Sequence, residues 1–219
     1  EKRAIAIHEA GHASVSWLLE HANPLVKVTI VPRGQSLGAA WYLPEERTIT
    51  TKEQMLDEIC ATLAGRAAEE VFLGRISSGA LNDLERVTQR AYGMVAYLGM
   101  SESLPNLSYY SNQESFQKPY SEETGRRIDA EVSRLINEQY ERAKRILTEN
   151  AAKHNALADL LCEHEVIFAA DVTNIFGPRP WKSRAEIIME EQPPVHHETP
   201  ADASLTSAEA MTPTADSAT

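Results

Sequence analysis

The chain has 219 residues, of which 42% are hydrophobic and 24% are charged, and its net charge is −11 at pH 7. This composition is that of an ordinary globular protein and supplies enough apolar side chains for one sizeable core. The acidic balance argues against nucleic-acid binding, and two widely separated cysteines do not indicate a disulfide framework.

Residues 4–20 carry apolar side chains at helical spacing and are followed by an Asn-Pro stop, so we expect an amphipathic helix. It contains His8, Glu9 and His12 in the pattern His-Glu-x-x-His, which is typical of zinc metalloproteases. Positions four apart share a helix face, so both histidines can bind one cation while the glutamate acts as base on a zinc-activated water. Gly11, inside the helix, predicts that another backbone passes close by.

A tetrahedral zinc site with an open position needs a third protein ligand from further along the chain. The metzincin extension is excluded, because Val15 and Leu18 stand where its glycine and histidine would be. The residues alone favour Asp83 only modestly over Glu69 and Glu70, because it falls in the first turn of a predicted helix, where the helix dipole also favours a carboxylate. The other candidates are Asp57, His154, Glu163, His164 and Glu165.

The segment 26–43 predicts a β-hairpin, with strands over its first six and last seven residues. A sheet edge beside a protease site can bind an extended substrate as an added strand. We therefore predict that Leu37, Gly38, Ala39 and Ala40 contact the substrate. A hairpin that merely packs on the metal-binding helix fits the pattern equally well.

A capping box at Thr51 and Gln54 predicts a helix that continues to about residue 72. Periodicity predicts further helices over residues 81–97, 121–150, 151–163 and 169–176. Apolar spacing in the longest of them indicates a core face rather than a partner groove. Residues 101–120 lack a period and are predicted to form an ordered loop. The expected fold class is mainly α, a helical zinc-peptidase domain with a small β-hairpin or sheet beside the His-Glu-x-x-His helix.

The composition changes after Trp181. Residues 183–219 contain one basic residue against seven acidic ones, a balance of −6, and are rich in proline, alanine, serine and threonine. We therefore predict a zinc metallopeptidase domain over residues 1–181 and a disordered, acidic C-terminal tail over residues 182–219. The neighbouring His196 and His197 receive no catalytic role, because a flexible pair cannot hold a ligand geometry.

Several motifs in order resemble the peptidase domain of the FtsH family, which comprises membrane-anchored, ATP-dependent zinc proteases. They lie at residues 8–12, 32–34, 37–38, 63–70, 78–84, 97–100 and 176–180. The resemblance extends from the first residue to about Trp181. It implies that His8, His12 and Asp83 bind one zinc ion per chain and that Glu9 is the catalytic base. Glu69 and Glu70 then become residues that support the ligands from outside.

The resemblance also implies what surrounds such a domain. The parent protein is expected to be a homo-hexamer in the bacterial inner membrane with this domain in the cytoplasm, performing protein quality control. An AAA ATPase module in the same polypeptide would feed it unfolded or membrane proteins. The sequence itself contains no phosphate-binding loop for ATP and no run of about 18 apolar residues, so we expect a soluble C-terminal portion of a longer protein.

Two other classes of function stay open from the sequence. One is a zinc-binding but inactive module that supports a ring assembly, which the presence of Glu9 disfavours. The other is a helical interaction domain without metal, in which the spacing of the two histidines is incidental.

Overall fold

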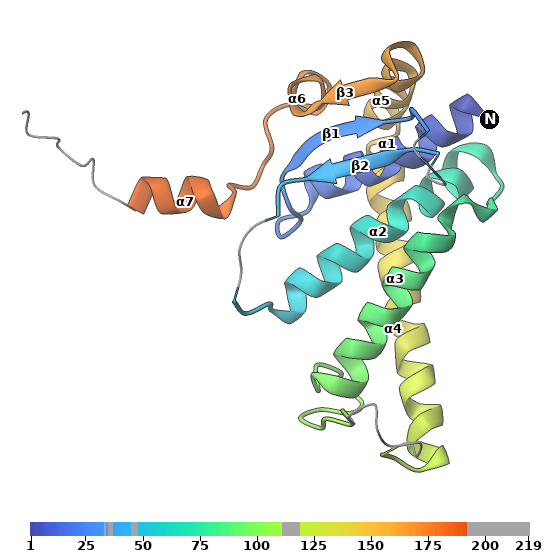
Figure 1. Cartoon of the computed structure of the whole chain (residues 1–219), viewed down its shortest axis with the longest axis vertical. Helices are drawn as coiled ribbons and strands as arrows, with labels where there is room; N and C mark the ends of the chain where they lie inside the picture. Colours follow the sequence, from blue (N-terminus) through green and yellow to red (C-terminus); the bar gives the residue numbers. More distant parts are fainter. Residues whose placement is uncertain (33, 35–36, 45–47, 111–118, 192–219) are drawn as a thin grey trace, which may run out of the picture.

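The computed structural model describes residues 1–32, 34, 37–44, 48–110 and 119–191. Its helices are α1 (Lys2–Leu18), α2 (Lys52–Leu73), α3 (Leu81–Tyr92), α4 (Glu122–Glu149), α5 (Ala151–His164), α6 (Ala169–Phe176) and α7 (Arg184–Glu191). A 3-10 turn, η1 (Ser78–Ala80), precedes α3, and a π-helical turn, η2 (Gly93–Tyr97), follows it. The strands β1 (Leu25–Thr29), β2 (Ala39–Tyr42) and β3 (Val166–Phe168) form one sheet (Figure 1). The mainly helical fold with a small sheet is thus confirmed.

Helices α1 and α2 pack closely because small residues line their contact. A Cβ added to Gly11 would lie 2.5 Å from the carbonyl oxygen of Ala64 and 2.7 Å from the Cβ of Ala68. No side chain fits at this position, which confirms that a second backbone passes close to the motif helix. Ala10 and Ala64 are themselves completely buried. This close approach brings α2 to the imidazoles of α1.

The sheet has the strand order β2-β1-β3, and both pairs are antiparallel. Val28 lies opposite Ala40 on one side and Ile167 on the other, and this row faces the core. The sequence did not predict β3, because three residues between two helices are too few to show alternation. With β1 in the middle, β2 is an edge strand, on the side of the sheet nearest α2 (Figure 1).

Local capping sets the ends of the helices that lead to the site. The Thr51 hydroxyl accepts the Gln54 N–H at 3.3 Å and the Gln54 side chain accepts the Thr51 N–H at 2.9 Å, so the capping box is confirmed. Gly74, at φ 64°, ends α2 in the left-handed conformation. The Ser77 hydroxyl then accepts the Gly79 N–H at 3.1 Å and starts η1. The chain therefore enters α3 with Asp83 in its first turn.

The long helix α4 uses its apolar stripe as core, as its spacing predicted. Ile128, Val132 and Leu135 are buried against α3 and η2. Ala143 and Leu147, further along the helix, are buried in the larger cluster formed with α1, α2 and α5. The helix therefore joins the two halves of the core.

Other segments differ from expectation. The helix predicted over 81–97 ends as an α-helix at Tyr92 and continues as a π-helical turn. Helix α7 occupies a part of the chain for which disorder was predicted, while residues 192–219, with His196 and His197, lie outside the described residues. Residues 111–118 of the predicted loop and Arg33, in the middle of the 32–34 turn, also lie outside the described residues. In the described ranges, no helix combines the length and apolarity needed to cross a bilayer.

Candidate metal centre

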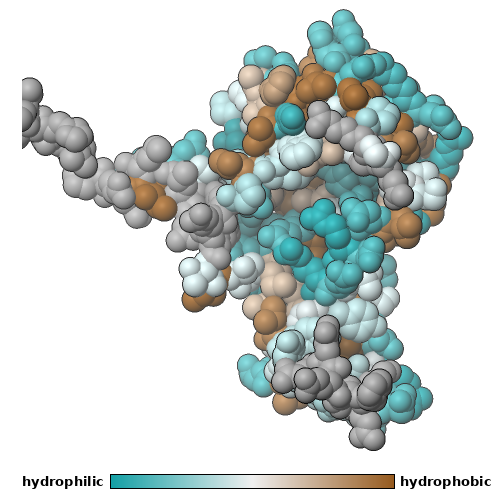
Figure 2. Space-filling model, in the orientation of Figure 1, coloured by the Kyte–Doolittle hydropathy of each residue, from teal (hydrophilic) through white to brown (hydrophobic). Residues whose placement is uncertain are grey.

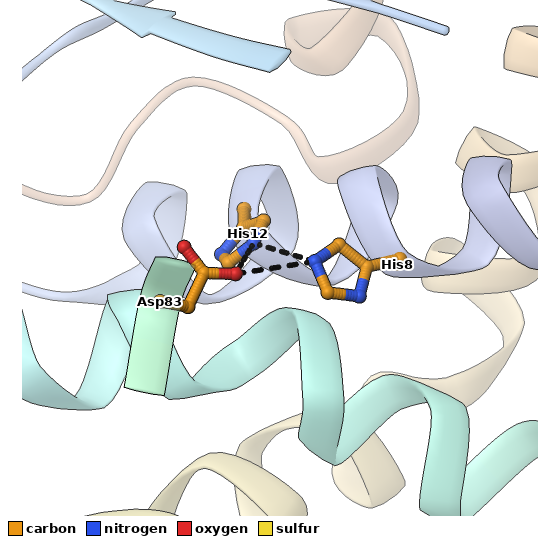
Figure 3. A group of neighbouring side chains, drawn as sticks. All are labelled: His8, His12 and Asp83. Carbon is orange, nitrogen blue, oxygen red and sulfur yellow. Dashed lines mark hydrogen bonds and ion pairs between the residues drawn. The ribbon is translucent and has the colours of Figure 1, made fainter. Parts of the chain in front are cut away.

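The side chains of His8, His12 and Asp83 converge on one point (Figure 3). The Nε2 atoms of the two histidines are 3.1 Å apart, and Oδ2 of Asp83 lies 3.3 Å from each of them. One ligand atom from each residue falls within 4.8 Å of the others. Two imidazole nitrogens and a carboxylate oxygen form a donor set that catalytic zinc sites use, with a further position left for water or substrate. The residues present therefore fit a zinc ion.

Contacts outside this cluster orient both imidazoles. Nδ1 of His8 lies 2.7 Å from Oε1 of Glu69, and Nδ1 of His12 lies 2.9 Å from the carbonyl oxygen of Ala61. Both partners are acceptors, so each Nδ1 carries a proton, and it is each Nε2, once free of its own proton, that can direct a lone pair at a metal ion in the cluster. Such partners fix the tautomer and the ring orientation of metal-binding histidines. Helix α2 supplies both of them.

Glu69 also ties the start of α3 to the site. Its Oε2 accepts the Ser77 N–H at 2.7 Å, and its Oε1 accepts the Ser77 hydroxyl at 3.0 Å. One buried carboxylate thus contacts a histidine on α1 and the turn that leads to Asp83. This arrangement holds two of the three candidate ligands relative to each other.

Gly65 is a site residue whose role the sequence analysis did not identify. A Cβ added there would lie 2.4 Å from Nε2 of His8 and 2.5 Å from Nε2 of His12. The α2 backbone therefore passes directly against both ligand atoms, and only glycine leaves them room. The sequence feature that could have pointed to this role is the position of Gly65 inside a predicted helix. Glycine there destabilises the helix by about 1 kcal/mol relative to alanine, so its presence indicates a close approach by another group.

The carboxylate of Asp83 and the imidazole of His12 shift each other's pKa in opposite directions, and each favours the charged form of the other. Burial of Asp83 opposes its ionisation, but hydrogen bonds from His12 and His8 outweigh this effect and hold its pKa below the usual range. Burial likewise opposes protonation of His12, while the hydrogen bond and the charge of Asp83 raise its pKa to about 9. A zinc ion binds neutral imidazole, so its binding would displace a proton from this pair.

Glu9 lies beside the cluster without belonging to the group of ligand atoms. It is 7% exposed, and burial raises the pKa of its carboxyl group against the opposing charges of His12 and His8. A Cβ added to Gly38 would lie 2.7 Å from Oε1 of Glu9, so the chain entering β2 passes directly against this carboxylate. A buried carboxylate with a raised pKa is suited to taking and returning a proton.

A cleft of about 1420 Å³ opens over these residues, between the β2 edge and α3. It is larger than a typical small-molecule pocket of about 300–1000 Å³. Leu37, Gly38, Ala39 and Ala40 all line it, and β2 itself begins at Ala39. The four residues predicted to contact substrate therefore lie on one wall of the cleft.

Other acidic and histidine candidates lie elsewhere. Glu70 accepts hydrogen bonds from Tyr140 and Lys144 on α4, so the structure does not bring it to the histidines as the sequence had suggested. The physical reason is that neighbouring positions on a helix point about 100° apart, and only Glu69 faces α1. Three further candidates have partners away from the histidines. Asp57 forms an ion pair with Arg142, and Glu165 forms one with Lys2. The ring of His154 stacks on Phe72.

The profile of Peptidase family M41 matches residues 1–175. The chain is 65% identical over 195 residues to an ATP-dependent zinc metalloprotease FtsH of Parabacteroides distasonis, covering 88% of the chain and 28% of the relative. It is 54% identical over 187 residues to the protein of the same name from Rhodothermus marinus, covering 83% and 27%.

A eukaryotic relative shows the same partial coverage. The mitochondrial inner membrane m-AAA protease component AFG3L2 of Mus musculus is 47% identical over 188 residues, covering 84% of the chain and 23% of the relative. The chain thus spans about a quarter of the length of these curated relatives.

Proposed function

The chain belongs to peptidase family M41, and we propose that it is a zinc-dependent endopeptidase with its active site at His8, Glu9, His12 and Asp83. The observation that carries the proposal is the convergence of three ligand atoms within 4.8 Å on the floor of a wide cleft. A buried carboxylate beside them supplies the base that peptide hydrolysis requires.

Each residue has a defined task in this proposal. His8 and His12 would hold the zinc ion through Nε2, and Asp83 would hold it through a carboxylate oxygen. When bound, zinc polarises the scissile carbonyl and lowers the pKa of the attacking water. Glu9 accepts the proton of that water and passes it to the leaving amine nitrogen. Glu69 keeps His8 in the ligating tautomer through its 2.7 Å contact with Nδ1.

The substrate is proposed to lie along β2 as an added strand. Support comes from the edge position of β2 and from the four residues at 37–40 that line the cleft. Main-chain hydrogen bonds would then provide much of the affinity. Peptides N-methylated at alternate backbone positions test this. In an added strand, every second N–H bonds to β2 and the others point away from it. Methylation of the first set should abolish binding, and methylation of the second set should not. Equal binding of both sets would contradict strand addition.

The larger setting is proposed from the family. We propose that the parent protein is a homo-hexamer anchored in the bacterial inner membrane, with an AAA ATPase module that feeds unfolded or membrane proteins to this domain for quality control. The chain alone should then cleave loose polypeptides without ATP and leave folded ones intact. Degradation of a tightly folded protein by this chain alone would contradict the proposed division of labour. Sedimentation of the full-length protein tests the hexamer.

The decisive experiment compares cleavage of casein, with zinc and without ATP, by the wild-type chain and by Glu9→Gln. We expect the variant to lose activity and to keep one zinc ion per chain. Glu149→Gln, on an exposed position of α4, is the matched control and should behave as wild type. Equal activity in wild type and Glu9→Gln would refute the assignment. Bound zinc without cleavage in the wild type would favour the inactive scaffold.

A further inference from the structure

Arg86 is a charged residue of the cleft that the proposed chemistry does not use. It lies on α3 three residues after Asp83, its side chain is exposed, and it lines the cleft. Across the part of the chain that the structure describes, no carboxylate pairs with it, whereas Arg90, the next arginine of α3, pairs with Glu58. Figure 2 shows hydrophilic residues gathered over α3 beside the hollow beneath the sheet.

Tyr42 lines the same cleft as Arg86 but comes from the sheet. It is the last residue of β2 and is half-buried. Burial raises the pKa of its hydroxyl, while the hydrogen bond with Ser16 and the positive charge of Arg86 act in the opposite direction. The Ser16 hydroxyl, 3.4 Å away, holds the Tyr42 hydroxyl against α1.

The distance of this pair from the metal ligands follows from the direction of β2. Gly38 lies against Glu9 and Tyr42 lies against Ser16, so β2 follows α1 in the same direction. Ser16 is one helical turn beyond His12, just as Arg86 is nearly one turn beyond Asp83. One turn is about 5 Å, and an extended peptide advances about 3.3 Å per residue. A residue one turn beyond the ligands therefore corresponds to a substrate position about two residues from the scissile bond.

We propose that Arg86 selects an acidic side chain of the substrate at this position. The inference rests on the proposed peptidase function and deepens it by naming a substrate preference. A guanidinium binds a carboxylate with two parallel hydrogen bonds, and it repels a basic side chain at the same place. Among the cleft residues that the structure describes, Arg90 is neutralised by Glu58, whereas Arg86 is a cation available to the substrate.

The test uses a series of fluorogenic peptides that share one parent sequence. Each peptide carries a single glutamate, glutamine or lysine at one of the three positions on either side of the scissile bond. We expect glutamate at one position to raise kcat/KM about three- to tenfold over glutamine. Arg86→Gln should remove this preference, and Arg86→Glu should shift it to lysine. Arg145→Gln, an exposed arginine of α4 outside the cleft, is the matched control.

A second readout separates this inference from the proposed function. Fluorescence anisotropy measures binding of the same peptides to zinc-loaded Glu9→Gln, with and without Arg86→Gln, and needs no cleavage. A preference for glutamate that disappears with Arg86→Gln supports the inference even if the wild type cleaves nothing, in which case only the proposed function fails. Equal binding of glutamate and glutamine peptides at every position, or a preference that survives Arg86→Gln, would overturn it.

Discussion

Gly65→Ala tests the geometry of the metal centre more directly than replacement of a ligand. The added methyl carbon would lie 2.4 Å from Nε2 of His8 and 2.5 Å from Nε2 of His12. Non-bonded carbon and nitrogen atoms prefer separations of about 3.5 Å, so the imidazoles must move by about 1 Å. Zinc–nitrogen bonds measure about 2.0–2.1 Å, so the methyl group also competes for the space that the ion needs.

The expected loss of zinc affinity is at least about 100-fold. Changing a residue that only orients a ligand already lowers metal affinity about 10- to 100-fold, and a 1 Å displacement exceeds the tolerance of about 0.5 Å for such sites. In the metal-free chain, the gain of about 1 kcal/mol from replacing a helical glycine opposes an overpacking cost of about 1–3 kcal/mol. Metal-free stability should therefore fall by no more than about 2 kcal/mol, while zinc affinity falls at least about 100-fold.

The assay is a zinc titration against a competing chelator, combined with thermal unfolding with and without zinc. A 100-fold loss of affinity removes about 2.7 kcal/mol of the stabilisation that zinc gives the folded state. Gly93→Ala is the matched control, because no atom lies within 4 Å of its added Cβ and its φ is −57°. Wild-type zinc affinity in Gly65→Ala would refute the placement of the ion between the two Nε2 atoms.

Three further outcomes follow from buried groups. Glu69→Gln should weaken zinc binding about 10-fold in a chelator competition, because His8 loses a charged partner. Unchanged affinity would show that Glu69 contributes packing and does not orient His8. Arg142→Ala should destabilise the chain by about 2–3 kcal/mol in urea unfolding, since it removes the guanidinium 2.7 Å from buried Asp57 and leaves this carboxylate with the His21 N–H at 3.0 Å. Arg145→Ala in the same helix should change stability little, and equal effects of the two changes would contradict the pairing. Burial lowers the pKa of His154 to about 4, below its unfolded value near 6.5, so the unfolded state takes up more protons between these values and stability is lost as the pH falls from about 6.5 to 4. Wild type should lose about 3 kcal/mol more over this range than His154→Leu, and parallel pH profiles would exclude a buried neutral histidine.

The sequence by itself determined the features that depend on neighbouring residues. The spacing of His8 and His12 places both on one helix face, and no tertiary contact is needed for that conclusion. The capping residues Thr51 and Ser121 begin their helices where the sequence predicted, because a cap bonds to a backbone group three residues away. The apolar stripe of α4 likewise identified a core face before its partners were known.

The tertiary structure decided what depends on distant segments. Asp83 meets the histidines from 71 residues beyond His12, and the choice of Glu69 over Glu70 as a neighbour of His8 depends on which face of α2 packs on α1. The need for glycine at position 65 and the pairing of β3 with β1 are likewise visible only after packing. Local periodicity fixes the face on which a side chain lies, but the packing of small residues between α1 and α2 fixes what that face meets.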